Sequence, residues 1–336
     1  MNVTDYSAIN TTLSVKERTF LTKEQLMQLI DAKDDAQVAL LLQATDYELT
    51  EAQLADTALI EAALMKQLAR AYRFAFEETP QVEVVELFAM AYMYHNLKIL
   101  GKMKATQRDL ASLCIPIGRY SLETLQHLMT TLQSERCEAL VVEEVAKTWQ
   151  EYLDYGDIDA IDMGFDSAYF RQLRTIATRL ENTVVTQFVD TWIDFFNIIT
   201  VKRALEQHQS QSFMYQLLSR KGTQSPTKMI ECVRNNQIAT WFETRNPFIF
   251  ESQFQDWVAK MKDGTITASE LEQLRDLFVH RLLEEGRFET QGALPLLRYL
   301  NGKELEIKNL RLILTGRANG LSREQILERM RPVYGE

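Results

Sequence analysis

Four runs of sequence, each with a hydroxyl residue before the start of a helix, decide the fold: Thr22-Lys-Glu-Gln-Leu-Met-Gln-Leu29, Ser121-Leu-Glu-Thr-Leu-Gln-His-Leu128, Ser225-Pro-Thr-Lys-Met-Ile-Glu-Cys232 and Ser322-Arg-Glu-Gln-Ile-Leu-Glu-Arg329. Each hydroxyl is placed to cap a helix by accepting from the free N–H groups of its first turn. Gln25 and Gln325 stand where a capping box needs them, and Pro226 stands at the first helical position. The four hydroxyl residues are 99, 104 and 97 residues apart, so the spacing predicts an internal repeat.

Other landmarks recur in the same order and with nearly the same step. They are a Gln-Leu pair, an asparagine inside an apolar helical segment, and a glycine shortly before the next cap. The pairs start at Gln67, Gln172 and Gln273, the asparagines are Asn96, Asn197 and Asn309, and the glycines are Gly118, Gly222 and Gly320. This order predicts three helical repeats at 1–118, 119–222 and 223–336, the last with a closing C-terminal helix at Ser322–Tyr334 that begins a fourth copy. The alternative is chance similarity among helix-rich segments.

The composition favours an all-helical chain. The 336 residues include 12 Gly and 6 Pro, which are too few for the many tight turns of a sheet protein of this length. A hydrophobic share of 46% supplies a packed core and excludes a disordered chain. Since each repeat is long enough for a small bundle, we predict an all-α fold of three similar helical bundles in a pseudo-threefold funnel or cone.

Charge and cysteine usage limit the compartment and the partners. With 47 acidic against 37 basic side chains the net charge is −10, which disfavours nucleic acid as a partner and direct anchoring on anionic lipid. The cysteines at 114, 137 and 232 are far apart, which is typical of a reducing compartment. The N-terminus lacks the pattern of a secretory signal, and the apolar stretch 87–94 is too short to span a bilayer.

The sequence carries no strong catalytic motif. It has no phosphate loop, no dinucleotide fingerprint and no nucleophile elbow, and its histidines, His95, His127, His208 and His280, are isolated. Asp31, Asp34 and Asp35 resemble the aspartate-rich motif of all-α magnesium-dependent prenyl-diphosphate enzymes, which need a second facing cluster to hold the metal. The acidic run 157–162 is flanked by glycines and favours a loop. We therefore predict no catalytic, cofactor or metal site, and keep that enzyme and a free-standing helical scaffold as alternatives.

Basic residues stand beside the glycine at each predicted repeat junction. They are Arg119, Arg220, Lys221 and Arg317. In a pseudo-threefold body the three loops would share one rim and form a basic, partner-binding ring. The other interpretation is that these cations complement the dipoles of nearby helix C-termini.

The C-terminal residues carry a specific resemblance. Residues 299–316, Tyr-Leu-Asn-Gly-Lys-Glu-Leu-Glu-Ile-Lys-Asn-Leu-Arg-Leu-Ile-Leu-Thr-Gly, followed by Gly-Leu-Ser-Arg-Glu-Gln-Ile at 320–326, resemble the closing signature of the family of V-type ATPase C subunits, known in eukaryotic enzymes as d subunits. Residues 194–203, Asp-Phe-Phe-Asn-Ile-Ile-Thr-Val-Lys-Arg, resemble the middle-repeat counterpart. Residues 91–98 resemble the first, but Met93 replaces the expected acidic residue.

This resemblance implies a non-catalytic rotor adaptor that joins a central shaft to a membrane rotor ring and transmits torque for ion transport. The expected partners are the shaft subunits and the ring, with one copy of the chain per complex. The expected location is the cytoplasmic face of the membrane, held there by protein contacts.

Overall fold

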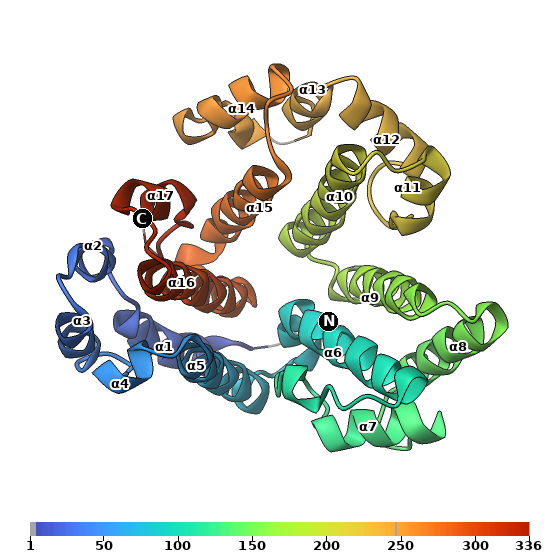
Figure 1. The fold of residues 1–336 in the computed structure, drawn as a ribbon, viewed down its shortest axis with the longest axis horizontal. Helices are drawn as coiled ribbons and strands as arrows, with labels where there is room; N and C mark the ends of the chain where they lie inside the picture. Colours follow the sequence, from blue (N-terminus) through green and yellow to red (C-terminus); the bar gives the residue numbers. More distant parts are fainter. Residues whose placement is uncertain (1–4, 246, 336) are drawn as a thin grey trace. The chain divides into compact units, whose positions relative to one another are not determined.

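A computed structural model describes residues 5–245 and 247–335, and within these ranges the chain forms helices and no strand. The predicted all-α class is therefore confirmed. Figure 1 follows the helices from the N-terminus to the C-terminus. The α-helices are α1 (Ser7–Lys16), α2 (Lys23–Asp31), α3 (Asp35–Leu42), α4 (Glu51–Leu54), α5 (Thr57–Glu78), α6 (Val82–Thr106), α7 (Leu122–Thr131), α8 (Ala139–Tyr155), α9 (Asp159–Leu180), α10 (Thr183–Glu206), α11 (Gln211–Leu217), α12 (Pro226–Arg234), α13 (Ile238–Glu243), α14 (Gln255–Lys262), α15 (Ala268–Leu283), α16 (Leu294–Ala318) and α17 (Arg323–Arg329). Short 3-10 helices are η1 (Glu17–Thr19), η2 (Ala111–Leu113), η3 (Pro247–Phe250), η4 (Ser252–Phe254) and η5 (Glu284–Phe288).

The predicted caps start four of these helices. The side chains of Thr22, Ser121, Ser225 and Ser322 each accept a hydrogen bond from the backbone N–H three residues later, at the start of α2, α7, α12 and α17. Thr22 and Ser322 form complete capping boxes with their glutamines. These bonds satisfy N–H groups that a helix leaves free in its first turn, so the sequence defines these starts locally.

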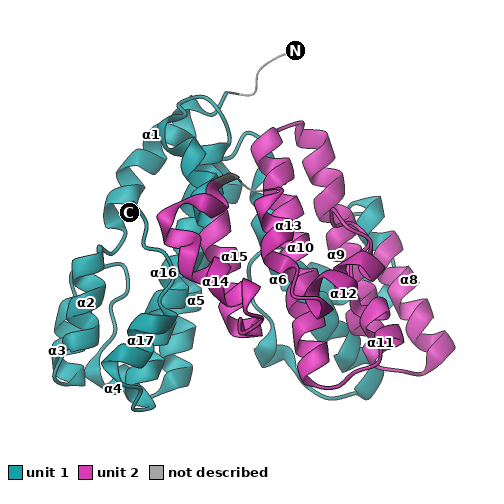
Figure 2. Cartoon of the chain, turned by 90° about the horizontal axis from the view of Figure 1, so that it is seen from above, with its two compact units in different colours: residues 1–142, 280–336 teal, residues 143–279 magenta. Residues whose placement is uncertain are grey.

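The chain packs into two units, coloured separately in Figure 2: unit 1 is Met1–Val142 with His280–Glu336, and unit 2 is Glu143–Val279. The boundaries fall inside α8 and α15. This division describes packing, whereas the predicted repeats 1–118, 119–222 and 223–336 describe copies in sequence. The three-repeat division stays a prediction.

Unit 1 is built around α16, which packs against α1, α2, α5, α6 and η5. Two carboxylates of α16 are paired inside this core, as buried polar groups usually are. Glu304 accepts the hydroxyls of Tyr72 at 2.7 Å and Tyr92 at 2.6 Å. Glu306 accepts from the backbone N–H of Leu21, from Lys303 Nζ at 2.8 Å and from the hydroxyl of Tyr47.

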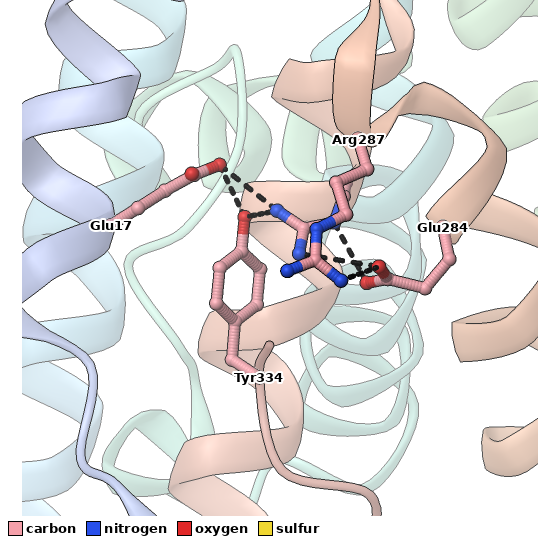
Figure 3. A network of polar contacts seen from close by, with 5 residues as sticks. Glu17, Glu284, Arg287 and Tyr334 are labelled. Carbon is pink, nitrogen blue, oxygen red and sulfur yellow. Dashed lines mark hydrogen bonds and ion pairs between the residues drawn. The ribbon is translucent and has the colours of Figure 1, made fainter. Parts of the chain in front are cut away.

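The two ends of the sequence meet in unit 1 through a polar network around Tyr334 (Figure 3). Its ring stacks on Phe20 with centroids 4.0 Å apart, and its hydroxyl donates to Glu17 and accepts from Arg298. Arg298 also pairs with Glu284 at 2.7 Å and with Glu17 at 3.2 Å. The last residues therefore hold the segment between α1 and α2 against α16.

Unit 2 has its core around α10, which packs against α9, α11 and α12. Phe278 lies at the centre of an aromatic cluster with Phe195, Phe242 and Phe254, at ring distances of 4.9 to 5.5 Å. In the described part of the chain, α10 is the one helix long and apolar enough to cross a membrane, and 56% of its most apolar window is buried. Its buried face carries Asp194 and Asn197, and both bond the backbone of the following loop.

Candidate partner-binding surfaces

Three buried asparagines hold the chain in the same way. Asn96 donates from Nδ2 to the carbonyl of Ile115 at 2.7 Å and accepts the N–H of Ile115 at 2.8 Å. Asn197 makes the same two bonds to Ser219, at 3.0 and 2.8 Å. Asn309 makes them to Arg331, at 3.1 and 2.7 Å. Each amide therefore pairs with a backbone as a neighbouring strand would, and fixes the loop after the short helix that follows its own long helix.

These bonds also give a way to align the three predicted copies. Asp109, Ser210 and Ser322 each lie 13 residues after the asparagine. Ser210 and Ser322 cap α11 and α17, and Asp109 accepts from the N–H of Ala111, the first residue of η2. Gly118 and Gly222 each lie three residues after the loop residue that their asparagine bonds. Ser322 is thus the counterpart of Ser210, and not of Ser121 and Ser225.

Two sequence expectations change with this register. Gly320 lies at the end of α16 with a φ of +73°, before the loop held by Asn309, so it does not match Gly118 and Gly222. When the three predicted copies are aligned on these asparagines, the segment Ser322–Tyr334 falls within the third predicted copy, whereas the spacing of the caps alone places it at the start of a fourth. The two alignments differ because Ser210 and Ser225 both cap short helices within one predicted copy, so a cap alone does not mark a repeat start.

Two of the predicted partner-binding cations make internal contacts. Arg119 pairs with Glu138 at 2.6 Å and with the buried Glu86 at 3.5 Å. Burial raises the pKa of Glu86 to about 7, because the charged form loses water, and Arg119 opposes that shift. Arg317 donates to the carbonyls of Ile30 and Ala32 at 3.0 and 2.8 Å. It thereby satisfies carbonyls at the C-terminal end of α2, as the dipole interpretation expects.

The other two cations stand on a rigid loop of unit 2. Arg220 and Lys221 are exposed, and Arg220 lies over the ring of Tyr215 at 5.3 Å. Side chains from α9 and α10 hold the backbone on both sides of them. Asn197 accepts the N–H of Ser219, and Arg174 donates to the carbonyl of Lys221 at 2.6 Å. Asp194 accepts the N–H of Thr223 at 2.8 Å and its hydroxyl at 2.6 Å. The loop therefore presents two positive charges with little freedom of the backbone.

These charges lie at the edge of a groove of about 1040 Å³ within unit 2. Its walls come from the end of α8, from α9, α10 and α11, and from the loop 218–221. Its apolar and aromatic lining residues are Tyr155, Met163, Phe170, Phe196, Tyr215, Leu217 and Leu218. Two carboxylates, Glu151 and Asp166, line it on the α8 and α9 side. The side chain of Tyr155 is 78% exposed, which is unusual for a large aromatic ring. The groove suits a helix with an apolar face and an acidic edge.

Sequence reasoning missed this groove. Phe170 and Phe196 lie on helices whose apolar periodicity predicts only core faces. Tyr155 ends α8 next to a glycine, where an aromatic residue gives no distinct signal. The exposed loop cations beside the glycine were the one indication of the site.

The acidic motif has local structural contacts. Asp31 pairs with Arg323 at 2.7 Å, and Asp34 caps α3 by accepting from the N–H of Gln37 at 2.9 Å. Within residues 5–245 and 247–335, no group of three or more His, Cys, Asp or Glu side chains could hold a metal ion. No contact of Asp31, Asp34 or Asp35 favours the diphosphate enzyme.

Comparison with known proteins covers nearly the whole chain. The family described as ATP synthase (C/AC39) subunit matches residues 9–329. The C subunit of the V-type sodium ATPase of Enterococcus hirae is 29% identical over 332 residues, 98% of this chain and 99% of that protein. The C subunit of the A-type ATP synthase of Methanocaldococcus jannaschii is 25% identical over 350 residues, 97% and 86% of the two chains. That of Pyrococcus abyssi is 21% identical, over 97% and 90%. The chain therefore belongs to the ATP synthase (C/AC39) subunit family, whose members are non-catalytic parts of rotary ATPases.

Proposed function

We propose that this chain is the rotor adaptor of a V-type or A-type rotary ATPase, with one copy per complex. It joins the central shaft to the membrane rotor ring and transmits torque for ion transport. It lies at the cytoplasmic face of the membrane and is held there by protein contacts. The observation that carries the proposal is the match to C subunits of such enzymes along 97–98% of the chain.

The asparagine-held loops support this role mechanically. An adaptor that carries torque needs loops that do not yield, and each of the three loops is fixed by two hydrogen bonds to a buried side chain. Close-packed helices transmit strain well. The recurrence of the same contact three times also supports three similar bundles in a pseudo-threefold funnel.

Within this role, we assign the unit 2 groove to a helix of the shaft. Arg220 and Lys221 attract acidic side chains, and the aromatic wall receives an apolar face. Arg119 and Arg317 contribute indirectly: the contact of Arg119 stiffens the loop before α7, and the contacts of Arg317 tie the last turn of α16 to the end of α2.

The test is reconstitution of the complex with and without this chain. We expect that ATP hydrolysis drives ion transport only when the chain is present. A complex that lacks the chain and still couples hydrolysis to transport would refute the adaptor role.

The groove has its own test. The double variant Arg220→Glu and Lys221→Glu should fold normally and bind the isolated shaft at least tenfold more weakly, with the largest difference at low salt. Arg179→Glu, an exposed residue of α9 outside the groove, is the matched control. Unchanged shaft affinity of the double variant would show that the groove does not bind the shaft. The adaptor role itself is decided by the reconstitution experiment.

A further inference from the structure

A second cavity, within unit 1, has the features of an anion site. It measures about 350 Å³ and lies among the end of α1, η1, the loop before α4, and helices α5 and α16. Four of its lining residues are basic, Lys16, Arg70, Arg73 and Lys303, and two are acidic, Asp46 and Glu77. The cavity wall therefore carries more basic than acidic side chains, whereas the chain as a whole has a net charge of −10.

Three of these cations have no carboxylate within 4 Å among residues 5–245 and 247–335. Lys16 places its Nζ over the ring of Phe74, 4.3 Å from the centroid. Arg70 donates to Gln67 Oε1 at 3.2 Å, and Arg73 is exposed. Their charges are therefore available to a ligand. Lys303 is different, because its Nζ already gives one proton to Glu306 and keeps two.

Tyr299 supplies the second, independent observation. Its side chain lines the cavity and the residue is 4% exposed, yet in the described part of the chain its hydroxyl makes no hydrogen bond. The hydroxyls of two neighbouring buried tyrosines do form hydrogen bonds: Tyr47 donates to Glu306, and Tyr72 donates to Glu304. A buried hydroxyl normally has a partner. The Tyr299 oxygen is not fully enclosed, and the side chain lines the cavity, so the hydroxyl faces the cavity.

We propose that this cavity binds a small phosphate-bearing anion, either pyrophosphate or the phosphate chain of a nucleotide. Two guanidinium groups match phosphate oxygens with paired N–H donors, and Lys16 adds a compact positive charge. The Tyr299 hydroxyl completes the donor set from the inner wall. Burial raises the pKa of Tyr299, so its proton is present at neutral pH. The volume lies at the lower end of the range for ligand pockets, which suits a group of this size.

Isothermal titration of the full chain at low salt tests the proposal, with pyrophosphate, ATP, adenosine and citrate as the added compounds. We expect saturable binding at one site for pyrophosphate or ATP, and none for adenosine. Equal affinity for pyrophosphate and ATP identifies the phosphate chain as the ligand; at least tenfold tighter binding of ATP identifies a nucleotide. Absence of saturable binding by both, or citrate binding as tightly as pyrophosphate, would overturn the proposal.

Variants locate the site and separate binding from folding. Tyr299→Phe removes only a hydroxyl without a partner, so the melting temperature should not fall, while affinity should drop about tenfold. Asp46→Asn removes a carboxylate from the wall and should tighten binding severalfold. Arg73→Ala should weaken binding, and Arg136→Ala, an exposed arginine outside the cavity, should leave it unchanged. If Tyr299→Phe binds as the wild type does, this cavity is not the site.

Discussion

The contact between Asn197 and Ser219 offers the sharpest test of how the loops are held. Asn197 is 0% exposed and Ser219 is 7% exposed, so water has poor access to the backbone groups that the amide bonds. Asn197→Ala leaves one N–H and one C=O of Ser219 buried without partners. Each such group costs about 1–3 kcal/mol, and we expect a loss of about 3 kcal/mol in the free energy of unfolding of unit 2.

The same substitution in the first copy should cost less. Asn96→Ala frees the backbone of Ile115, which is half-buried, so water can replace the lost bonds. There we expect a loss of about 1–2 kcal/mol. Asn319→Ala is the control, since Asn319 is exposed and makes one bond, to the carbonyl of Thr315 at 2.9 Å. Its effect should stay within about 0.5 kcal/mol.

Urea unfolding can follow unit 2 by itself, because all four tryptophans, Trp149, Trp192, Trp241 and Trp257, belong to it. Their fluorescence should report the loss in Asn197→Ala, while circular dichroism reports the whole chain. Hydrogen exchange at the Ser219 amide should accelerate in the same variant. A loss below about 0.5 kcal/mol, or unchanged exchange at Ser219, would show that the asparagine does not hold the loop.

Three further predictions concern groups next to these loops. Glu86 has a folded-state pKa of about 7 against an ordinary value of 4.5, so between these pH values the folded chain binds a proton that the unfolded chain has lost. The free energy of unfolding should therefore fall as the pH rises from about 4.5 to 7, by at most about 3 kcal/mol. Glu86→Gln should reduce this pH dependence in urea unfolding at pH 5 and pH 8, and an unchanged pH dependence would assign it to other groups. Gly222→Ala would place a Cβ against Asp194 Oδ1 inside van der Waals contact, and should cost about 1–3 kcal/mol by tryptophan fluorescence, whereas equal stability would mean that the loop can shift. Arg317→Ala leaves two carbonyls of the α2 end without their donor and should cost about 1–2 kcal/mol by circular dichroism; no loss would mean that water replaces the guanidinium.

The helices were predictable from sequence because their signals are local. Thr22 and Ser322 form the capping boxes that the spacing to Gln25 and Gln325 predicts, and Pro226 occupies the first position of α12. A cap depends on three or four consecutive residues, so no distant contact is needed to identify it. The family was predictable for a related reason: Asn309 and the apolar run after it form one continuous motif on α16.

The candidate sites were less accessible because they depend on contacts between distant segments. Arg317 is followed by an alanine, an asparagine and a glycine, and nothing nearby indicates that it bonds the carbonyls of Ile30 and Ala32, 287 and 285 residues away. Arg119 and Arg220 are both exposed and both stand near a glycine, yet Arg119 pairs with Glu138, whereas Arg220 has no ion pair with any residue that the structure describes. Tertiary packing decides which of these cations remains available to bind a partner. The apolar periodicity of the sequence carries no information on it.

The register of the repeats also has a structural consequence at the end of the chain. Counting three residues past the loop residue bonded by each asparagine gives Gly118, Gly222 and Tyr334. In the first two copies this position leads within three residues to the cap of the next helix, at Ser121 and Ser225. In the third predicted copy the position carries an aromatic side chain that stacks on Phe20 and bonds Glu17. A position that leads to the next helix in the first two predicted copies therefore fastens the segment after α17 to the segment between α1 and α2 in the third.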